Sequence, residues 1–131
     1  MAGILVNEGE KRIADIILGS QAVDATLYIG LYTNGSQPSE TAALSDITEV
    51  SGTGYARKAL TRGSWTGSDD AKAYAEQTFG PAGTDWGTVT GYFIATSADN
   101  SGKLMIVESF PAGIPIGVGS SQSVTPTVTF A

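Results

Sequence analysis

The chain has 131 residues, the length of one ordinary domain, and we predict a single domain over residues 1–131. Charged residues make up only 15%, which leaves much uncharged surface for contacts with other subunits. The net charge is −6 with seven basic residues, which argues against a basic patch for DNA or RNA. Cysteine is absent, no apolar run could span a bilayer, and the start lacks a signal-peptide pattern. We therefore expect synthesis in a cytoplasm and no membrane partner.

Residues 7–19 carry the pattern of an amphipathic helix. Asn7 is expected to cap the first turn, with Glu10 completing a capping box, and Gly19 to end the helix in a left-handed conformation. Three isoleucines share one face of this helix: Ile13, Ile16 and Ile17. With residues 1–6 ahead of it, the helix is a candidate docking arm. The alternative is that it folds onto the domain's own sheets.

From residue 25 onward the apolar residues alternate, as in β-strands. Residues 25–33 predict a strand with Leu27, Ile29 and Leu31 on one face and Tyr28 and Tyr32 on the other. Residues 34–38 are dense in turn formers. Residues 39–47 then predict a short helical turn capped by Ser39, and residues 53–61 a further strand.

The segment 68–80 fits two structures. Ser68 as a cap, Asp69 and Asp70 in the first turn, and an alanine-rich body ending at Gly80 suit a helix. The alternation of residues 71–78 suits an edge strand instead. We favour the strand because the surrounding pattern is β.

The last third of the sequence predicts a hairpin and a terminal strand. Residues 87–96 and the apolar run 104–107 flank a turn at residues 98–102, and a Gly/Pro-rich loop is expected over residues 111–119. The terminal segment then alternates, with Val124, Pro126, Val128 and Phe130 on one face. Because Pro126 cannot donate to a ladder, this strand is predicted to lie at an edge or to carry a bulge.

These segments together predict a mainly β fold, an antiparallel β-sandwich or jelly-roll-like domain with one N-terminal α-helix, where residues 1–19 form the N-terminal arm and the helix. An exposed sheet edge invites aggregation unless something covers it. A symmetric homo-oligomer, in which each subunit covers its neighbour's edge, would solve this problem.

The sequence offers few groups for catalysis. Histidine and cysteine are both absent, which removes the usual nucleophilic triads and most zinc sites. No spacing pairs the carboxylates, residues 113–119 lack the ending of a phosphate loop, and residues 99–102 lack the ladder of a calcium loop. We therefore predict no enzyme, no catalytic residue, no metal site and no cofactor.

Large apolar side chains are the candidates for contacts with partners. In a sandwich such residues pack in the core or against another subunit. Trp65 and Trp86 have a second reading, since exposed aromatic rings can stack on sugars. The candidate docking or subunit-interface residues are Ile13, Ile16, Ile17, Tyr28, Tyr32, Trp65, Trp86, Val124, Val128 and Phe130.

Several segments resemble small structural proteins of tailed bacteriophages. They are residues 27–34 followed by Pro38, then residues 44–49, 54–57, 79–87 and 88–94, and the ending 119–130. The similarity runs from about Leu27 to the C-terminus. It implies a virion protein of the size of head decoration, head-fibre or tail-fibre-associated subunits. It also favours a strand over residues 71–79 and implies no active site.

The resemblance implies first a decoration, or cement, protein on the outer head surface. Such a protein would act as a symmetric homo-oligomer, expected to be a homotrimer, and bridge subunits of the major capsid protein. A subunit that binds only the assembled shell stabilises it by mass action. The alternative is a tail or head-fibre subunit that binds host-surface glycans, and a carbohydrate-active enzyme is a third, weaker reading.

Overall fold

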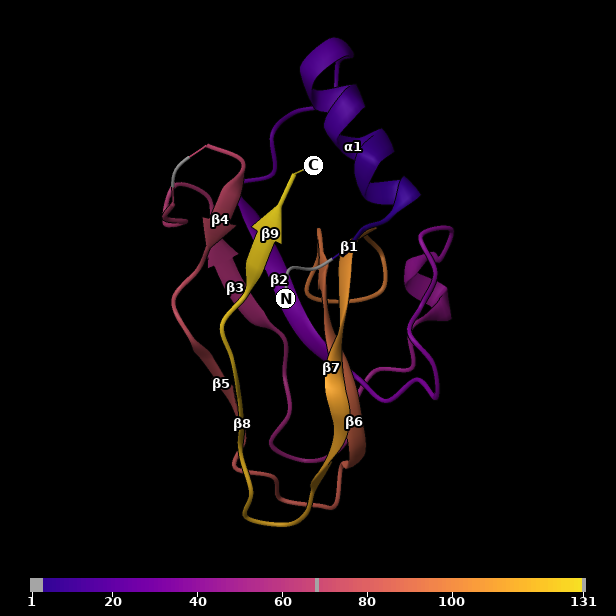
Figure 1. Ribbon diagram of the computed structural model, residues 1–131, viewed down its shortest axis with the longest axis vertical. Coiled ribbons are helices and arrows are strands. Elements are labelled where there is room, and N and C mark those ends of the chain that lie inside the picture. The colour runs from indigo at the N-terminus through magenta and orange to yellow at the C-terminus, as the bar shows by residue number, and fades with distance from the viewer. Residues whose placement is uncertain (1–3, 68, 131) are drawn as a thin grey trace.

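The computed structural model describes residues 4–67 and 69–130. Figure 1 shows one α-helix at one end of a β-structure. The helices are α1 (Asn7–Leu18) and the short 3-10 helix η1 (Leu44–Asp46). The strands are β1 (Ile4–Leu5), β2 (Thr26–Tyr32), β3 (Lys58–Thr61), β4 (Ala71–Ala73), β5 (Gln77–Phe79), β6 (Gly87–Ala95), β7 (Leu104–Ile116), β8 (Gln122–Val124) and β9 (Thr127–Thr129).

Five strands form an antiparallel sheet in the order β1-β7-β6-β2-β3. The predicted hairpin is its centre, with Ile94 of β6 opposite Ile106 of β7. On the other side of β6, Ile29 of β2 is opposite Ile94. Aliphatic side chains in register across three strands give this sheet one strongly apolar face.

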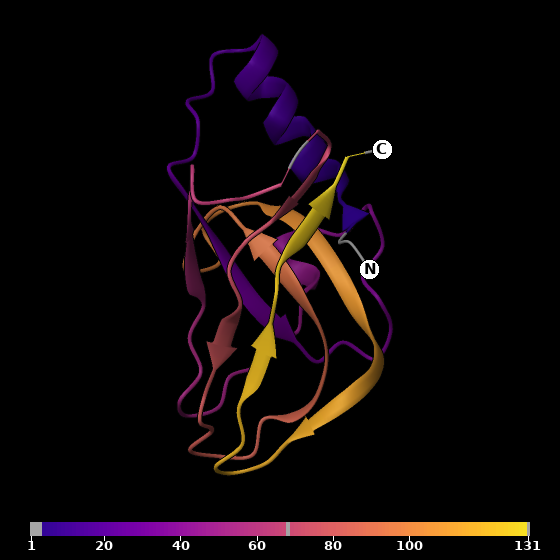
Figure 2. The same ribbon diagram turned by 60° about the vertical axis from the view of Figure 1, so that its left-hand side comes forward.

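The remaining strands pair two by two, β4 with β9 and β5 with β8, and form a second layer along one face of the large sheet (Figures 1 and 2). The space between the layers is filled by a cluster that includes Ile29, Leu60, Phe79 and Val128. The predicted antiparallel sandwich with one N-terminal helix is therefore confirmed.

The opposite face of the large sheet is covered by residues 33–50. There Tyr32, Phe93 and Val107 pack with Leu44 of η1 in a second apolar cluster. This cover is itself tied to β2, because Val50 donates its N–H to the Leu31 carbonyl and Thr33 donates to Thr48. The alternation predicted for residues 25–33 thus serves two cores, one on each side of β2.

Helix α1 exists where predicted, but both predicted caps are wrong. The N-cap is Val6, with no side-chain cap bond, and Asn7 instead donates its N–H to the Glu40 carbonyl over 2.7 Å. Gly19 has φ −113°, an extended conformation rather than the left-handed one. The reason is tertiary. β1 runs directly into the helix, and residues 33–50, which we call the cover segment, supply the carbonyl that accepts the N–H of the first helical residue.

The ambiguous segment forms strands, as favoured, namely β4 (Ala71–Ala73) and β5 (Gln77–Phe79). The expected cap at Ser68 lies outside the described residues. The prediction of a loop over residues 111–119 is wrong for its first part, because β7 continues to Ile116. This part of β7 pairs again with β6, with Ile114 opposite Val89. A register shift between the two paired stretches accommodates Pro111 and Gly113, whereas Pro115 lies in the second stretch, opposite Thr88.

Other boundaries are shorter than predicted. Only residues 44–46 of the expected helical turn are helical, and Ser39 bonds Thr41 rather than capping them. The strand expected over residues 53–61 begins only at Lys58. The terminal alternation is confirmed, with Val124, Pro126 and Val128 buried, and Pro126 separates β8 from β9.

Candidate functional site

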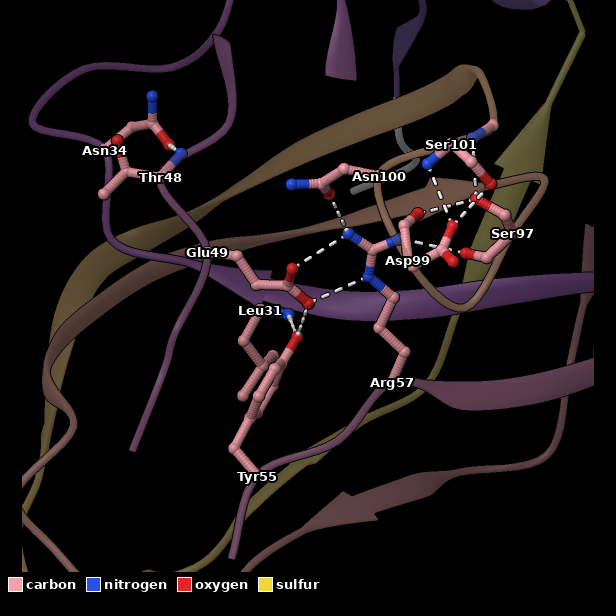
Figure 3. A network of polar contacts seen from close by, with 11 residues as sticks. Leu31, Asn34, Thr48, Glu49, Tyr55, Arg57, Ser97, Asp99, Asn100 and Ser101 are labelled. Carbon is pink, nitrogen blue, oxygen red and sulfur yellow. Dashed lines mark hydrogen bonds and ion pairs between the residues drawn. The ribbon is translucent and has the colours of Figure 1, made fainter. Parts of the chain in front are cut away.

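The most densely bonded polar group of the described chain surrounds Arg57 (Figure 3). Its guanidinium donates two bonds to the Glu49 carboxylate, at 2.8 and 2.9 Å. It donates further to the carbonyls of Ser97 and Asp99 and to the side-chain oxygen of Asn100. The Arg57 side chain is only 3% exposed. One buried cation therefore joins the cover segment, the strand approach to β3 and the β6–β7 turn.

Tyr55 extends this network into the core. Its hydroxyl donates to Glu49 over 2.6 Å and accepts the backbone N–H of Leu31 over 3.0 Å. Its ring stacks on Phe79 of β5, with 5.9 Å between ring centroids. Burial, and then the bond to Glu49, raise the pKa of Tyr55 far above 10.0. The phenol therefore stays protonated and keeps donating.

Asn34 closes the cover segment on its other side (Figure 3). Its side-chain nitrogen donates to the Asp46 carbonyl over 2.9 Å, and its oxygen accepts the N–H of Thr48 over 2.8 Å.

In the β6–β7 turn, two bonds from Ser101 hold the pKa of Asp99 below its usual value. These contacts are those of structural clamps, since each group faces backbone or an ion partner.

The described residues contain no grouping of three Asp, Glu, His or Cys side chains that could hold a metal ion. None of their helices is long and apolar enough to cross a membrane.

Four of the candidate interface residues lie in the chain's own core. Tyr32 is fully buried and donates its hydroxyl proton to the Glu108 carbonyl, and Trp86 is 5% exposed and donates to the Thr53 carbonyl. Val124 and Val128 face the sandwich interior. Such side chains have almost no surface left for another subunit. Trp86 also cannot stack on a sugar, because its ring is covered by the rest of the chain.

The other candidates gather at the helix end, except Tyr28, which is half-buried in the middle of β2. Ile13 and Trp65 line an apolar hollow of about 220 Å3 together with Phe130. Ile16 lines a neighbouring hollow of about 210 Å3. The two hollows share three walls, Leu27, Trp65 and Met105, and we call them together the helix-end groove.

The last turn of α1 projects beyond the strands at this end of the molecule, as Figure 1 shows. Ile17 is 70% exposed and Leu18 is 86% exposed. We call these two residues the helix tip. Sequence reasoning found Ile17 but not Leu18, because Leu18 falls outside the isoleucine face at helical spacing.

Sequence reasoning also missed two cations at the helix-end groove, Arg62 and Lys72. The residue pattern does not link them, since Arg62 follows β3 and Lys72 lies between two alanines of β4. Only the pairing of β4 with β9, between segments more than fifty positions apart, brings Lys72 to the groove.

A family model described as podophage GP4 fiber I protein gp80 matches residues 5–127. The sequence matches none of the curated proteins. The matched region contains α1 with the helix tip, strands β2 to β8 and the Arg57 network.

Proposed function

The chain belongs to the podophage GP4 fiber I protein gp80 family, a family of phage virion structural proteins, and we propose that it is a fibre subunit held in the virion through its helix end. The match spans nearly the whole described chain, so the shared unit is most of the sandwich together with its helix. The expected relation to structural proteins of tailed phages is confirmed at this level.

The distribution of exposed apolar side chains carries the proposal for the helix end. Six large apolar residues of the described chain are exposed, and all but Val118 belong to β1, α1, the loop after α1, or the terminal segment. These five residues, without Val118, are Ile4, Ile17, Leu18, Val23 and Phe130. A soluble monomer rarely leaves such residues clustered, so a concentration at one end marks a surface that another chain covers.

A structural subunit of this kind works by burial and repetition. Burying one such side chain stabilises a contact by about 1.5–3 kcal/mol. When copies attach together, each further attachment is intramolecular, so weak contacts add up to firm retention. We propose that the chain assembles as a homo-oligomer and catalyses no reaction. The homotrimer stays a prediction, and mass photometry of the purified protein tests it.

Head decoration is the second candidate, and the shape of the subunit favours it. The described residues form a short sandwich with no repeat or extended shaft, which would suit a knob on the capsid surface. In that case the helix end would contact the major capsid protein. Host-glycan binding rests on Trp65, whose ring is half-buried and packs edge-on against Tyr74 at 5.3 Å.

The location and copy number of the protein in virions test the proposal. Quantitative mass spectrometry should give a few tens of copies per virion, and antibody labelling in electron micrographs should mark fibres. Hundreds of copies spread over the head would overturn the fibre proposal and support decoration. Polysaccharide hydrolysis that is lost on changing one carboxylate would contradict a purely structural role.

A further inference from the structure

The helix-end groove has apolar walls, and its rim carries two cations, Arg62 and Lys72, while its one carboxylate, Asp24, is paired with Arg12. Lys72 is opposite Val128 in the β4–β9 pair, so the two side chains point to the same face, and Val128 faces the core. Lys72 is therefore a lysine on the inward side of a strand. Its ammonium donates to the Gly67 carbonyl over 3.0 Å, and the described residues give it no carboxylate partner.

Arg62 contributes a second charge to the same rim. It follows β3 directly and lines the hollow that Ile16 and Val23 also line. No ion pair or side-chain hydrogen bond involves Arg62 within the described part of the chain. Four other cations do have carboxylate partners: Lys11, Arg12, Arg57 and Lys103.

Two unpaired cations beside one groove are notable in this composition. The chain has 13 acidic residues and only seven basic ones, so carboxylates outnumber cations almost two to one. Lysine on an edge strand can discourage aggregation, and long side chains can cover apolar rings. Those roles account for one unpaired lysine, Lys72. They do not account for a second cation, Arg62, that lies at the same groove without a carboxylate partner.

The helix tip has the complementary properties. It is apolar through Ile17 and Leu18, and the last turn of α1 contains no basic residue. Asp15 adds a negative charge one turn earlier, where its only ion partner among the described residues is the exposed Lys11. The carbonyl groups at a helix C-terminus also carry partial negative charge. An apolar, negative knob thus lies on the same molecule as an apolar, positive hollow.

The two surfaces do not meet within one chain. Ile13 and Ile16 already line the helix-end groove from their own side. The first turns of α1 are held against β7 by Gly9, and the ion pair between Arg12 and Asp24 fixes the loop that follows the helix. The tip is about 14 Å along the helix axis from Gly9, at 1.5 Å per residue.

We propose that the helix tip of one copy inserts into the helix-end groove of another copy. Ile17 and Leu18 would fill the hollow beside Trp65, and Arg62 and Lys72 would face the negative end of the helix. Each copy has one tip and one groove, so contacts of this kind leave none unused in a reciprocal dimer or a ring, and a head-to-tail series closes into a ring only when the rotation between copies closes. The inference deepens the proposed function by naming the partner of the helix end.

A complementation experiment in solution tests this contact. The tip variant, Ile17→Ser with Leu18→Ser, keeps the groove, and the groove variant, Arg62→Glu with Lys72→Glu, keeps the tip. Each variant alone should lose self-association, by at least about a hundredfold in apparent Kd for the tip variant, since two buried side chains are lost. A 1:1 mixture should restore a complex, because one intact tip meets one intact groove. Analytical ultracentrifugation measures all three samples.

Matched controls separate this contact from general effects. Lys58→Glu changes a cation of β3 that also lacks an ion pair in the described chain but lies outside the groove, and it should assemble like the wild type. Wild-type association should weaken with added salt. Circular dichroism must show that the variants are folded. If charge reversal unfolds the chain, Arg62→Gln with Lys72→Gln replaces it.

Three results would overturn the inference. They are a monomeric wild-type protein, variants that assemble as well as wild type, and a mixture that stays monomeric although each variant alone has lost assembly. A monomeric wild-type protein would also contradict the proposed homo-oligomer, whereas the other two results would not. None of the three contradicts a place in the fibre, which virion copy number decides separately. The failures of the two proposals are therefore distinguishable.

Discussion

Gly9 of α1 lies directly against the backbone of Met105 in β7. A Cβ placed on Gly9 would come within 2.5 Å of the Met105 carbonyl oxygen and 2.9 Å of its Cα. Backbone atoms cannot yield as a flexible side chain can, so only glycine lets the helix approach the strand this closely. The direction in which the helix tip projects depends on this contact.

Gly9→Ala should destabilise the protein, although alanine favours helices by about 1 kcal/mol over glycine. The clash should outweigh that gain, with a net loss of about 1–2 kcal/mol in the free energy of unfolding. Urea denaturation measures it. Ala14→Gly, at an exposed position of the same helix, is the propensity control and should cost about 1 kcal/mol. A Gly9→Ala protein more stable than wild type would contradict the close packing.

Arg57→Lys should destabilise the fold by about 2–3 kcal/mol, although it keeps the positive charge. Lysine cannot make two parallel bonds to Glu49 and still reach the carbonyls of Ser97 and Asp99. The loss should fall somewhat below that of a fully buried pair, because Glu49 is 23% exposed. Lys11→Met, which breaks an ion pair exposed on both sides, should change stability by less than about 0.5 kcal/mol. Similar losses for both variants would show that the Arg57 network adds little.

One substitution at two asparagines should have opposite effects. Asn34→Asp replaces a nitrogen that donates to the Asp46 carbonyl with an oxygen, and two acceptors then face each other. We expect a loss of about 1–2 kcal/mol. Asn100→Asp replaces an amide oxygen that already accepts from Arg57, so a carboxylate there should be neutral or stabilising. Thermal unfolding of the two variants, which have equal net charge, decides the matter. Equal destabilisation would contradict the assigned bonds.

Alkaline pH should unfold the protein through its buried tyrosines. Burial raises the pKa of Tyr32, Tyr55 and Tyr92 above the ordinary value of 10.0. Because the folded pKa values are raised, this stability is fully present below pH 10.0 and is lost as the pH rises further. Absorbance at 295 nm should show these three phenols ionising only as near-ultraviolet circular dichroism is lost. Ionisation of all three near pH 10 in a folded protein would refute it, and single Tyr→Phe variants assign the signals.

The sequence predicted the architecture where one side-chain pattern decided the structure. The alternation of residues 25–33, and the same alternation ending at Phe130, place residues on faces with no information from elsewhere in the chain. It failed where distant segments decide. Asn7 does not cap α1 because Val6, directly after β1, takes the N-cap position, and the Glu40 carbonyl accepts the N–H of Asn7 in the first turn. The proline-containing stretch after Phe110 remains part of β7, because the pairing with β6 shifts its register there and then resumes.

The candidate site was predicted only in part for a similar reason. Ile13, Ile16 and Ile17 were found because a helix repeats at a known period. Tyr32 and Trp86 were indistinguishable from exposed aromatics, since burial depends on what packs above them. Arg62 and Lys72 reach the helix-end groove only through the turn after β3 and the pairing of β4 with β9. Neither of these features can be read from composition or from the period of the sequence.

The end of the sandwich away from the helix has a practical consequence. The turn around Val118 joins β7 to β8 there, and Gly119 and Ser120 fix its base with bonds to Ala82 and Gly117. Val118 itself is 71% exposed. A peptide or a fluorescent tag inserted at Val118 would therefore extend away from the helix, on a turn that is already anchored. Labelled particles could then be built without touching the end that assembles, and natural variants could lengthen this turn with little effect on attachment.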